Sequence, residues 1–350
     1  MKRLKQTTVT IFALTTACIG NAQTIWTVDP NPARSADYAT IQDAVTDASV
    51  VDGDILYVSG SGDNQGSVNL TKRITIYGPG FFISENYPGR LNPATAKISS
   101  LTLNNGSAGS TICGLEITGN VQVSSDNITL KRCRTHSPIF IGSAAIHVGD
   151  TIITQCYLES TSWTIDSSTG DNGNLFISNN IIISGTGSTS YRALRLSVND
   201  SAIVTQNVFM GSVIIYDTAL TNNVFLDSQT AFIQAPFIGE GSSVLNNVSV
   251  DGSTPLPTNN GGNIANNLND ADLLALFISG GTTDGQYQIA LDGPLDGTGL
   301  NNHDIGIFGG DNPWVLSGLP PLPTIELLNA PLFGSPTGGL PVTIRARTQN

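Results

Sequence analysis

Two aspartates have residue types and a spacing that could support chemistry. Asp227 and Asp251 each lie four positions after an asparagine, Asn223 and Asn247, and each follows a short aliphatic run. If successive runs stack as strands of a parallel sheet, the two carboxylates lie about 5 Å apart, where they can share a proton or a cation. Asp also favours the point where a strand enters a turn. The pair is therefore a candidate catalytic site, with a structural turn as the alternative.

A second group of residues could hold an acidic sugar. The run at positions 131–136 holds four basic residues, and two more arginines follow downstream. Guanidinium groups pair well with carboxylates, and a tyrosine ring offers a face for stacking. The alternative is a solvated strand face, because no carboxylate is expected at the level of the basic run. The candidate ligand-binding residues are Arg132, Arg134, Arg192, Arg195 and Tyr157.

A degenerate repeat is expected to position these side chains. An aliphatic residue stands three positions before an Asn or Cys, in steps of roughly 16 to 27 residues. Asn tolerates the left-handed backbone of a tight bend, and its amide can bond to the turn beside it. The repeat therefore predicts an all-β solenoid with an internal ladder. The ladder positions are Cys133, Cys156, Asn180, Asn207, Asn223, Asn247 and Asn267.

Three segments near the N-terminus resemble the cap of a known fold. Residues 38–45 (YATIQDAV), 53–58 (GDILYV) and 74–80 (ITIYGPG) look like the N-terminal cap of pectin-lyase-like right-handed parallel β-helix proteins. Together with the ladder, the resemblance covers roughly residues 25–270 and implies three parallel sheets around a packed interior. Enzymes of that family need several charged groups on adjacent turns, which this chain offers only in the candidates above.

The ends of the repeat need covers, because open strand edges invite aggregation. A short amphipathic helix at 40–48 is expected to cover the first turn, and residues 270–277 the last. The expected organisation of the chain is a signal peptide at 1–22, a β-helix with its N-terminal cap at 23–278, a C-terminal wrap at 279–318, and a Pro-rich boundary with a tail strand at 319–350.

The leader indicates export, since Lys2, Arg3 and Lys5 precede an apolar stretch and small residues. Removing it takes three of the 15 basic and none of the 27 acidic residues, which leaves a net charge of −15. Such a chain repels nucleic acid. No other apolar run is long enough to span a membrane.

Three cysteines follow the leader. Because the number is odd, they cannot all pair in disulfides within the chain. Cys133 and Cys156 are expected to stack about 5 Å apart on adjacent turns, which permits a disulfide, although reduced thiols are favoured. No zinc set is spaced along the chain. Residues 166–174 are rich in oxygen ligands but lack the spacing of a calcium loop.

We therefore expect an exported β-helix protein, secreted, periplasmic or at the cell surface, that acts by display, adhesion or glycan binding without catalysis. The alternative is a polysaccharide lyase or glycoside hydrolase acting on an acidic polysaccharide. The expected partner is a polysaccharide or cell-surface glycan, not nucleic acid, and the expected state is a monomer. No cofactor is expected, and calcium is the one ion left open.

Overall fold

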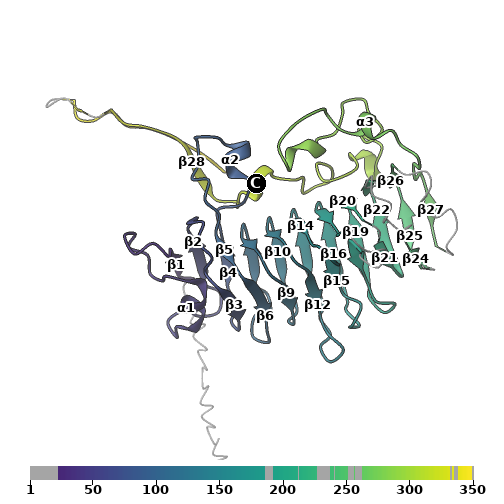
Figure 1. Ribbon diagram of the computed structural model, residues 1–350, viewed down its shortest axis with the longest axis horizontal. Coiled ribbons are helices and arrows are strands. Elements are labelled where there is room, and N and C mark those ends of the chain that lie inside the picture. The colour runs from purple at the N-terminus through teal and green to yellow at the C-terminus, as the bar shows by residue number, and fades with distance from the viewer. Residues whose placement is uncertain are drawn as a thin grey trace, which may run out of the picture.

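The repeat winds into a right-handed parallel β-helix, as predicted (Figure 1). The computed structural model describes residues 23–185, 192–211, 213–226, 237–239, 241–250, 256, 262–331, 333, 334 and 338–348. Three parallel sheets, here called A, B and C, contain 11, 8 and 8 strands among these residues. Each complete turn contributes one strand to each sheet, so residues far apart in sequence become neighbours along the solenoid.

The strands of sheet A are, in spatial order, β1 (Ile25–Val28), β2 (Ile55–Val58), β4 (Thr75–Tyr77), β7 (Thr111–Cys113), β10 (Thr129–Lys131), β13 (Ile152–Thr154), β16 (Leu175–Ser178), β19 (Ala202–Thr205), β22 (Thr218–Thr221), β25 (Ser243–Leu245) and β27 (Ile264–Ala265). Those of sheet B are β5 (Lys97–Ile98), β8 (Glu116–Ile117), β11 (Arg134–Thr135), β14 (Tyr157–Glu159), β17 (Ile181–Ile183), β20 (Val208–Met210), β23 (Val224–Leu226) and β26 (Val248–Ser249). Those of sheet C are β3 (Ser67–Leu70), β6 (Ser100–Leu103), β9 (Val121–Val123), β12 (Ile139–Ile141), β15 (Ile165–Asp166), β18 (Leu194–Arg195), β21 (Val213–Ile215) and β24 (Phe237–Ile238).

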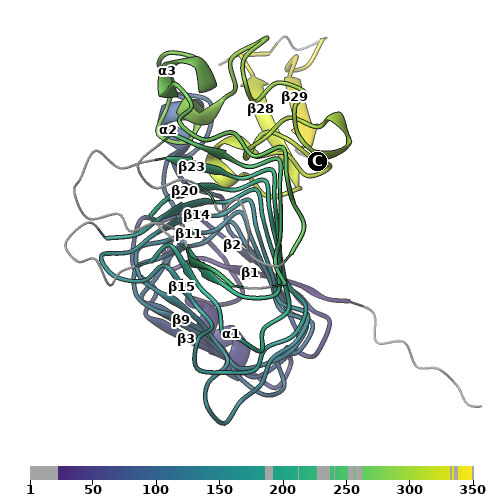
Figure 2. The ribbon, with the colours of Figure 1, turned by 90° about the vertical axis from the view of Figure 1, so that its right-hand side faces the viewer.

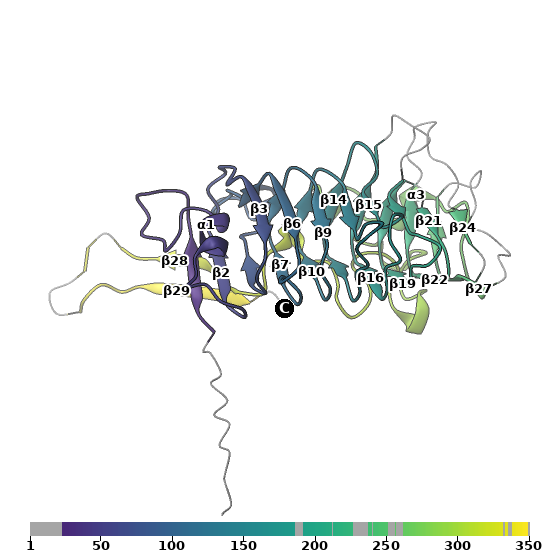
Figure 3. The ribbon, with the colours of Figure 1, turned by 90° about the horizontal axis from the view of Figure 1, so that it is seen from below.

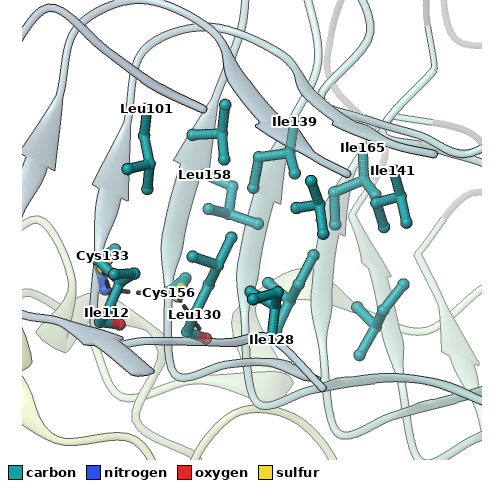
Figure 4. Packing of buried hydrophobic residues seen from close by; sticks show 14 of the residues in the cluster. Leu101, Ile112, Ile128, Leu130, Cys133, Ile139, Ile141, Cys156, Leu158 and Ile165 are labelled. Atoms are coloured by element: carbon teal, nitrogen blue, oxygen red, sulfur yellow. Dashed lines mark hydrogen bonds between the residues drawn. The ribbon is translucent and has the colours of Figure 1, made fainter. Parts of the chain in front are cut away.

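The interior is a continuous column of aliphatic side chains. Alternate residues of each strand point inward, and β-branched and Leu side chains from all three sheets meet there (Figure 4). Phe209 and Phe225 occupy matching positions on β20 and β23, and their rings stack with centroids 5.1 Å apart. Identical side chains on successive turns therefore pack directly on one another.

Inward-facing asparagines form the predicted ladder. The backbone N–H of Asn180 donates to Oδ1 of Asn207 at 3.0 Å, and that of Asn207 donates to Oδ1 of Asn223 at 2.9 Å. Each amide nitrogen also donates to a backbone carbonyl, as Nδ2 of Asn207 does to Ile177 at 2.9 Å. These three asparagines are fully buried, so the ladder supplies the hydrogen bonds that water cannot.

The ladder begins with thiols. Cys133 and Cys156 are buried and free, and the backbone N–H of Cys133 approaches Sγ of Cys156 at 3.4 Å (Figure 4). Burial raises the pKa of Cys113, the third thiol, to about 12. All three cysteines therefore pack as small apolar groups.

The left-handed backbone conformation at each bend falls on a different residue than expected. The residue in the left-handed region is the one before each ladder position, with Asn179 at a φ of 53° and Asn222 at 56°. The expectation that the ladder residue adopts this conformation is wrong, because its side chain must point inward while its predecessor turns the chain. The left-handed residues are Arg132, Gln155, Asn179, Gln206, Asn222, Asn246 and Asn266.

A short helix covers the first turn, as predicted. Helix α1 (Ile41–Thr46) begins after Thr40, whose Oγ1 accepts a hydrogen bond from the N–H of Asp43 at 3.1 Å. Its buried face, with Ile41 and Val45, closes the N-terminal end of the core.

The segment expected to cover the last turn is placed differently. Helix α3 (Leu273–Leu276) leaves Leu274 87% exposed and buries Leu276 in a cluster with Val248 of sheet B. It therefore packs on the outside of sheet B instead of closing the interior, since its apolar face continues the outer cluster.

The chain then returns along the outer face of sheet B (Figures 1 and 2). Three 3-10 turns, at Gly285–Tyr287, Leu300–Asn302 and Leu316–Gly318, interrupt this wrap. Trp314 and Ile307 of the wrap are buried against outward side chains of sheet B such as Tyr157 and Val208. The wrap therefore forms a second apolar core outside the solenoid.

Left-handed residues also fasten the wrap. Their side chains point outward, so Nη1 of Arg132 donates to the carbonyl of Leu319 at 2.7 Å, and Nδ2 of Asn179 donates to that of Ile307 at 2.9 Å. On a later turn the N–H of Leu300 donates to Oδ1 of a third such residue, Asn222. Successive turns thus hold the wrap's backbone by repeated polar contacts.

The last described strands, β28 (Pro323–Asn329) and β29 (Thr343–Thr348), pair antiparallel as a hairpin. The hairpin extends away from the solenoid beside its N-terminal turns (Figures 1 and 3). Among the described residues, no helix has both the length and the apolar character needed to cross a membrane.

Candidate functional site

A row of charged side chains lies on the N-terminal part of sheet B, before the positions that pack against the wrap. Lys97, Glu116 and Arg134 occupy the same register on β5, β8 and β11. The next position in this row, on β14, is Tyr157, and from there the row is apolar and covered by the wrap. The covered positions are Ile181, Val208, Val224 and Val248.

A neighbouring row completes a charged cluster. His136 follows β11 and Glu159 ends β14, and the imidazole lies between two carboxylates. Its Nε2 is 2.8 Å from Oε1 of Glu116, and its Nδ1 is 2.6 Å from Oε1 of Glu159. Nη2 of Arg134 donates to the same Glu159 oxygen at 2.8 Å. We call Lys97, Glu116, Arg134, His136 and Glu159 the sheet B cluster.

Mutual pairing fixes the charges of this cluster. Burial would raise the pKa of Glu116, but hydrogen bonds from His136 and Thr95, with the charges of Lys97 and Arg134, outweigh it and lower the pKa to about 2. Hydrogen bonds to the two glutamates raise the pKa of His136 to about 9. At neutral pH both carboxylates are ionised and the imidazole is a cation.

The raised pKa of His136 predicts a pH-dependent stability. Its ordinary pKa is about 6.5, so the contribution is fully present below that pH and is lost as pH rises through about 9. We expect the native state to lose on the order of 2 kcal/mol between pH 6 and 10 through this group. Urea unfolding across that range should show the loss in the wild type and a smaller loss in His136→Gln.

A matched control is His147→Gln, since His147 is exposed and has no charged partner among the described residues. This variant should keep the wild-type pH dependence. An equal loss of stability with pH in wild type and His136→Gln would contradict the pairing.

Aromatic rings border the cluster. The guanidinium carbon of Arg134 lies 4.4 Å from the ring centre of Phe82 and 5.7 Å from that of Tyr157. Phe82 precedes α2 (Ile83–Asn86) and meets Tyr157 edge to face at 5.1 Å. Cation–π contacts of this kind hold a guanidinium in place. Arg134 is therefore fixed between an aromatic wall and two carboxylates.

The predicted ligand-binding residues occupy three places. Arg134 and Tyr157 come together at the sheet B cluster. Arg132 is buried, with Nε donating to Oε1 of Gln155 at 2.9 Å, and fastens the wrap. Arg192 and Arg195 lie together on the side of sheet C.

On sheet C, Arg195 is engaged within the protein. Its Nε and Nη2 donate to the two oxygens of Asp166 at 3.0 and 2.8 Å. Its guanidinium carbon lies 3.2 Å from the ring centre of Trp163. Burial and the charge of Arg195 lower the pKa of Arg192. The charge of Arg195 is therefore compensated by Asp166 within the protein.

The two predicted catalytic aspartates, Asp227 and Asp251, lie outside the described residues. The expectation that the basic run lacks carboxylates at its level is wrong, because Glu116 and Glu159 lie on the two neighbouring turns. The ladder register could have revealed Glu159. His136 and Glu159 each stand three positions after a ladder cysteine, so they are expected side by side on adjacent turns.

No group of three or more His, Cys, Asp or Glu residues in the described part of the chain is arranged to hold a metal ion. The oxygen-rich stretch at 166–174 instead contains internal hydrogen bonds, such as that from Nδ2 of Asn172 to Oγ of Ser167 at 2.8 Å. Neither a family model nor a curated protein nor a solved structure matches the chain.

Proposed function

We propose that the protein is an exported, non-catalytic β-helix that binds an acidic glycan at the sheet B cluster. The observation that carries the proposal is the set of charges at this cluster, in which three cations and two carboxylates meet on a partly exposed face of sheet B. Lys97 and His136 are its more accessible cations, with side chains 36% and 29% exposed. Arginine and lysine can bind sugar carboxylates, and carboxylates can accept hydrogen bonds from sugar hydroxyls.

The protonation states favour binding over catalysis. A general acid or base works best when its pKa lies near the operating pH. Glu116, with a pKa of about 2, is ionised and His136, with a pKa of about 9, is protonated at neutral pH. Glu159 also has a lowered pKa, because bonds from His136 and Arg134 outweigh its burial. This leaves the cluster without a group ready to exchange a proton.

Two features of the sequence support a glycan outside the cell. The segments at 38–45, 53–58 and 74–80 resemble the cap of pectin-lyase-like proteins, many of which act on acidic polysaccharides. The leader at 1–22 has the pattern of a secretory signal. Export would place the protein in the periplasm, in the medium or at the cell surface.

Affinity electrophoresis of residues 23–350 in gels containing plant, algal or bacterial acidic polysaccharides tests the proposal. We expect retardation by at least one of them, and about tenfold weaker binding for Lys97→Gln and for His136→Gln, since each removes a cation. Arg73→Gln and His147→Gln are the matched controls and should bind as the wild type does. Absence of retardation on every polysaccharide, or equal retardation of all variants, would overturn the proposal.

A polysaccharide lyase or glycoside hydrolase is the second candidate. The observation in its favour is that Glu116, Arg134, His136 and Glu159 converge within direct contact on one sheet face. In that case His136 would act as a base only when it loses its proton, so turnover should rise with pH through about 9.

A further inference from the structure

A groove separate from the sheet B cluster lies at the N-terminal end of sheet A. Its volume is about 710 Å³, within the range of small-molecule sites. Tyr57 and Tyr77, on β2 and β4, form one wall. Leu319, Leu322 and Ile325, at the end of the wrap and the start of β28, form the other.

The tyrosine wall follows from the register of sheet A. Tyr57 and Tyr77 are paired on adjacent turns and point outward, with ring centres 5.9 Å apart. The same position on the next turn is Cys113, so the aromatic surface ends after two strands. Tyr77 lines the groove and is half-buried there, and this burial raises the pKa of its phenol.

The opposite wall depends on a close backbone approach. The N–H of Phe81 donates to the carbonyl of Ser317 at 2.8 Å. A Cβ at Gly80, where φ is 98°, would lie 2.3 Å from that carbonyl oxygen. Only glycine therefore lets the chain pass this point and bring Leu319 and Leu322 over the tyrosines. The groove is a fixed consequence of how the wrap docks.

The lining is mostly apolar, and its polar residues are Thr27, Ser59, Asn92 and the cation Arg90. Arg90 lines the groove and is exposed, and its guanidinium has no acidic partner among the described residues. The phenol groups of Tyr57 and Tyr77 likewise have no hydrogen-bond partner in the described part of the chain. A mostly apolar groove whose one charged lining residue is Arg90 is complementary to a ligand with an apolar body and one negative charge.

We propose that this groove binds an amphiphilic carboxylate. The apolar body lies between the two tyrosines and the leucines of the opposite wall, and the carboxylate pairs with Arg90. The assignment is independent of the glycan proposal, because no residue of the sheet B cluster lines the groove.

Isothermal titration of residues 23–350 with decanoate, and with 1-decanol as its neutral counterpart, tests the assignment. We expect decanoate to bind, and Arg90→Gln to weaken it about tenfold while leaving decanol binding unchanged. Leu322→Ser should weaken both ligands, because it removes part of the apolar wall. Arg73→Gln and His136→Gln should leave both affinities as in the wild type, and circular dichroism would establish that each variant is folded.

No binding of decanoate to the wild type would overturn the proposal, as would equal decanoate affinity in Arg90→Gln. An oligouronide that binds in an Arg90-dependent way where decanoate does not would assign the groove to a sugar and also reject it. Failure of glycan binding at the sheet B cluster would leave these outcomes unaffected.

Discussion

Replacing Asn207 with leucine is expected to lower the free energy of unfolding by about 3 to 5 kcal/mol. The side chain is fully buried and accepts a bond from the N–H of Asn180 at 3.0 Å. It also donates to the carbonyl of Ile177 and to Oδ1 of Asn223, at 2.9 and 3.0 Å. Leucine has a similar volume but leaves these groups buried without partners. Urea denaturation followed by circular dichroism measures the loss.

The matched control is Asn199→Leu, at an exposed asparagine whose side-chain amide donates to Asp171. We expect its effect to stay within about 0.5 kcal/mol. A loss at Asn207 no larger than at Asn199 would show that the ladder does not stabilise the solenoid.

Replacing Asp284 with alanine is expected to release the end of the wrap and to remove about 3 kcal/mol of stability. Asp284 is fully buried. Its carboxylate accepts bonds from the N–H of Ser317 at 2.7 Å, Nδ2 of Asn86 at 2.8 Å and the indole N–H of Trp314 at 3.2 Å. Without it, the N–H of Ser317 and the indole N–H of Trp314 lose the acceptor described here, and Nδ2 of Asn86 keeps only its bond to Oγ of Ser317.

Limited proteolysis with mass spectrometry detects this release. Asp284→Ala should be cut within 279–318 much faster than the wild type, while the solenoid stays resistant. Asp311→Ala, at an exposed position in the same segment, should be cut at the wild-type rate. Identical digestion of both variants would mean that the wrap is held without Asp284.

The fold was readable from the sequence because a ladder residue fixes the register of each turn. Once Asn180 and Asn207 are aligned, the strands that follow them are aligned too, and both start one residue later. The sequence did not predict that the left-handed residues point outward and bond to the wrap. Arg132 and Asn179 donate to the carbonyls of Leu319 and Ile307, which are 187 and 128 residues away in sequence. Bonds to backbone carbonyls cannot be recognised from the spacing of side-chain types.

The sheet B cluster was only half predictable. Arg134 and Tyr157 were expected as binding residues, and they lie together with His136 of the same basic run. Glu116 was missed because its turn precedes the first ladder cysteine and so had no register marker. The groove could not be predicted, since its two walls come from Tyr77 and from residues more than two hundred positions later.

We propose that the sheet B cluster binds a glycan without cleaving it. The most direct test is prolonged incubation of residues 23–350 with the polysaccharide that retards it, with calcium, from pH 6 to 10. Unsaturated uronate absorbance and reducing ends are followed together. We predict no product at any pH, with retardation that weakens in His136→Gln. Product that accumulates as pH rises through about 9 and disappears in His136→Gln would contradict the claim and identify an enzyme.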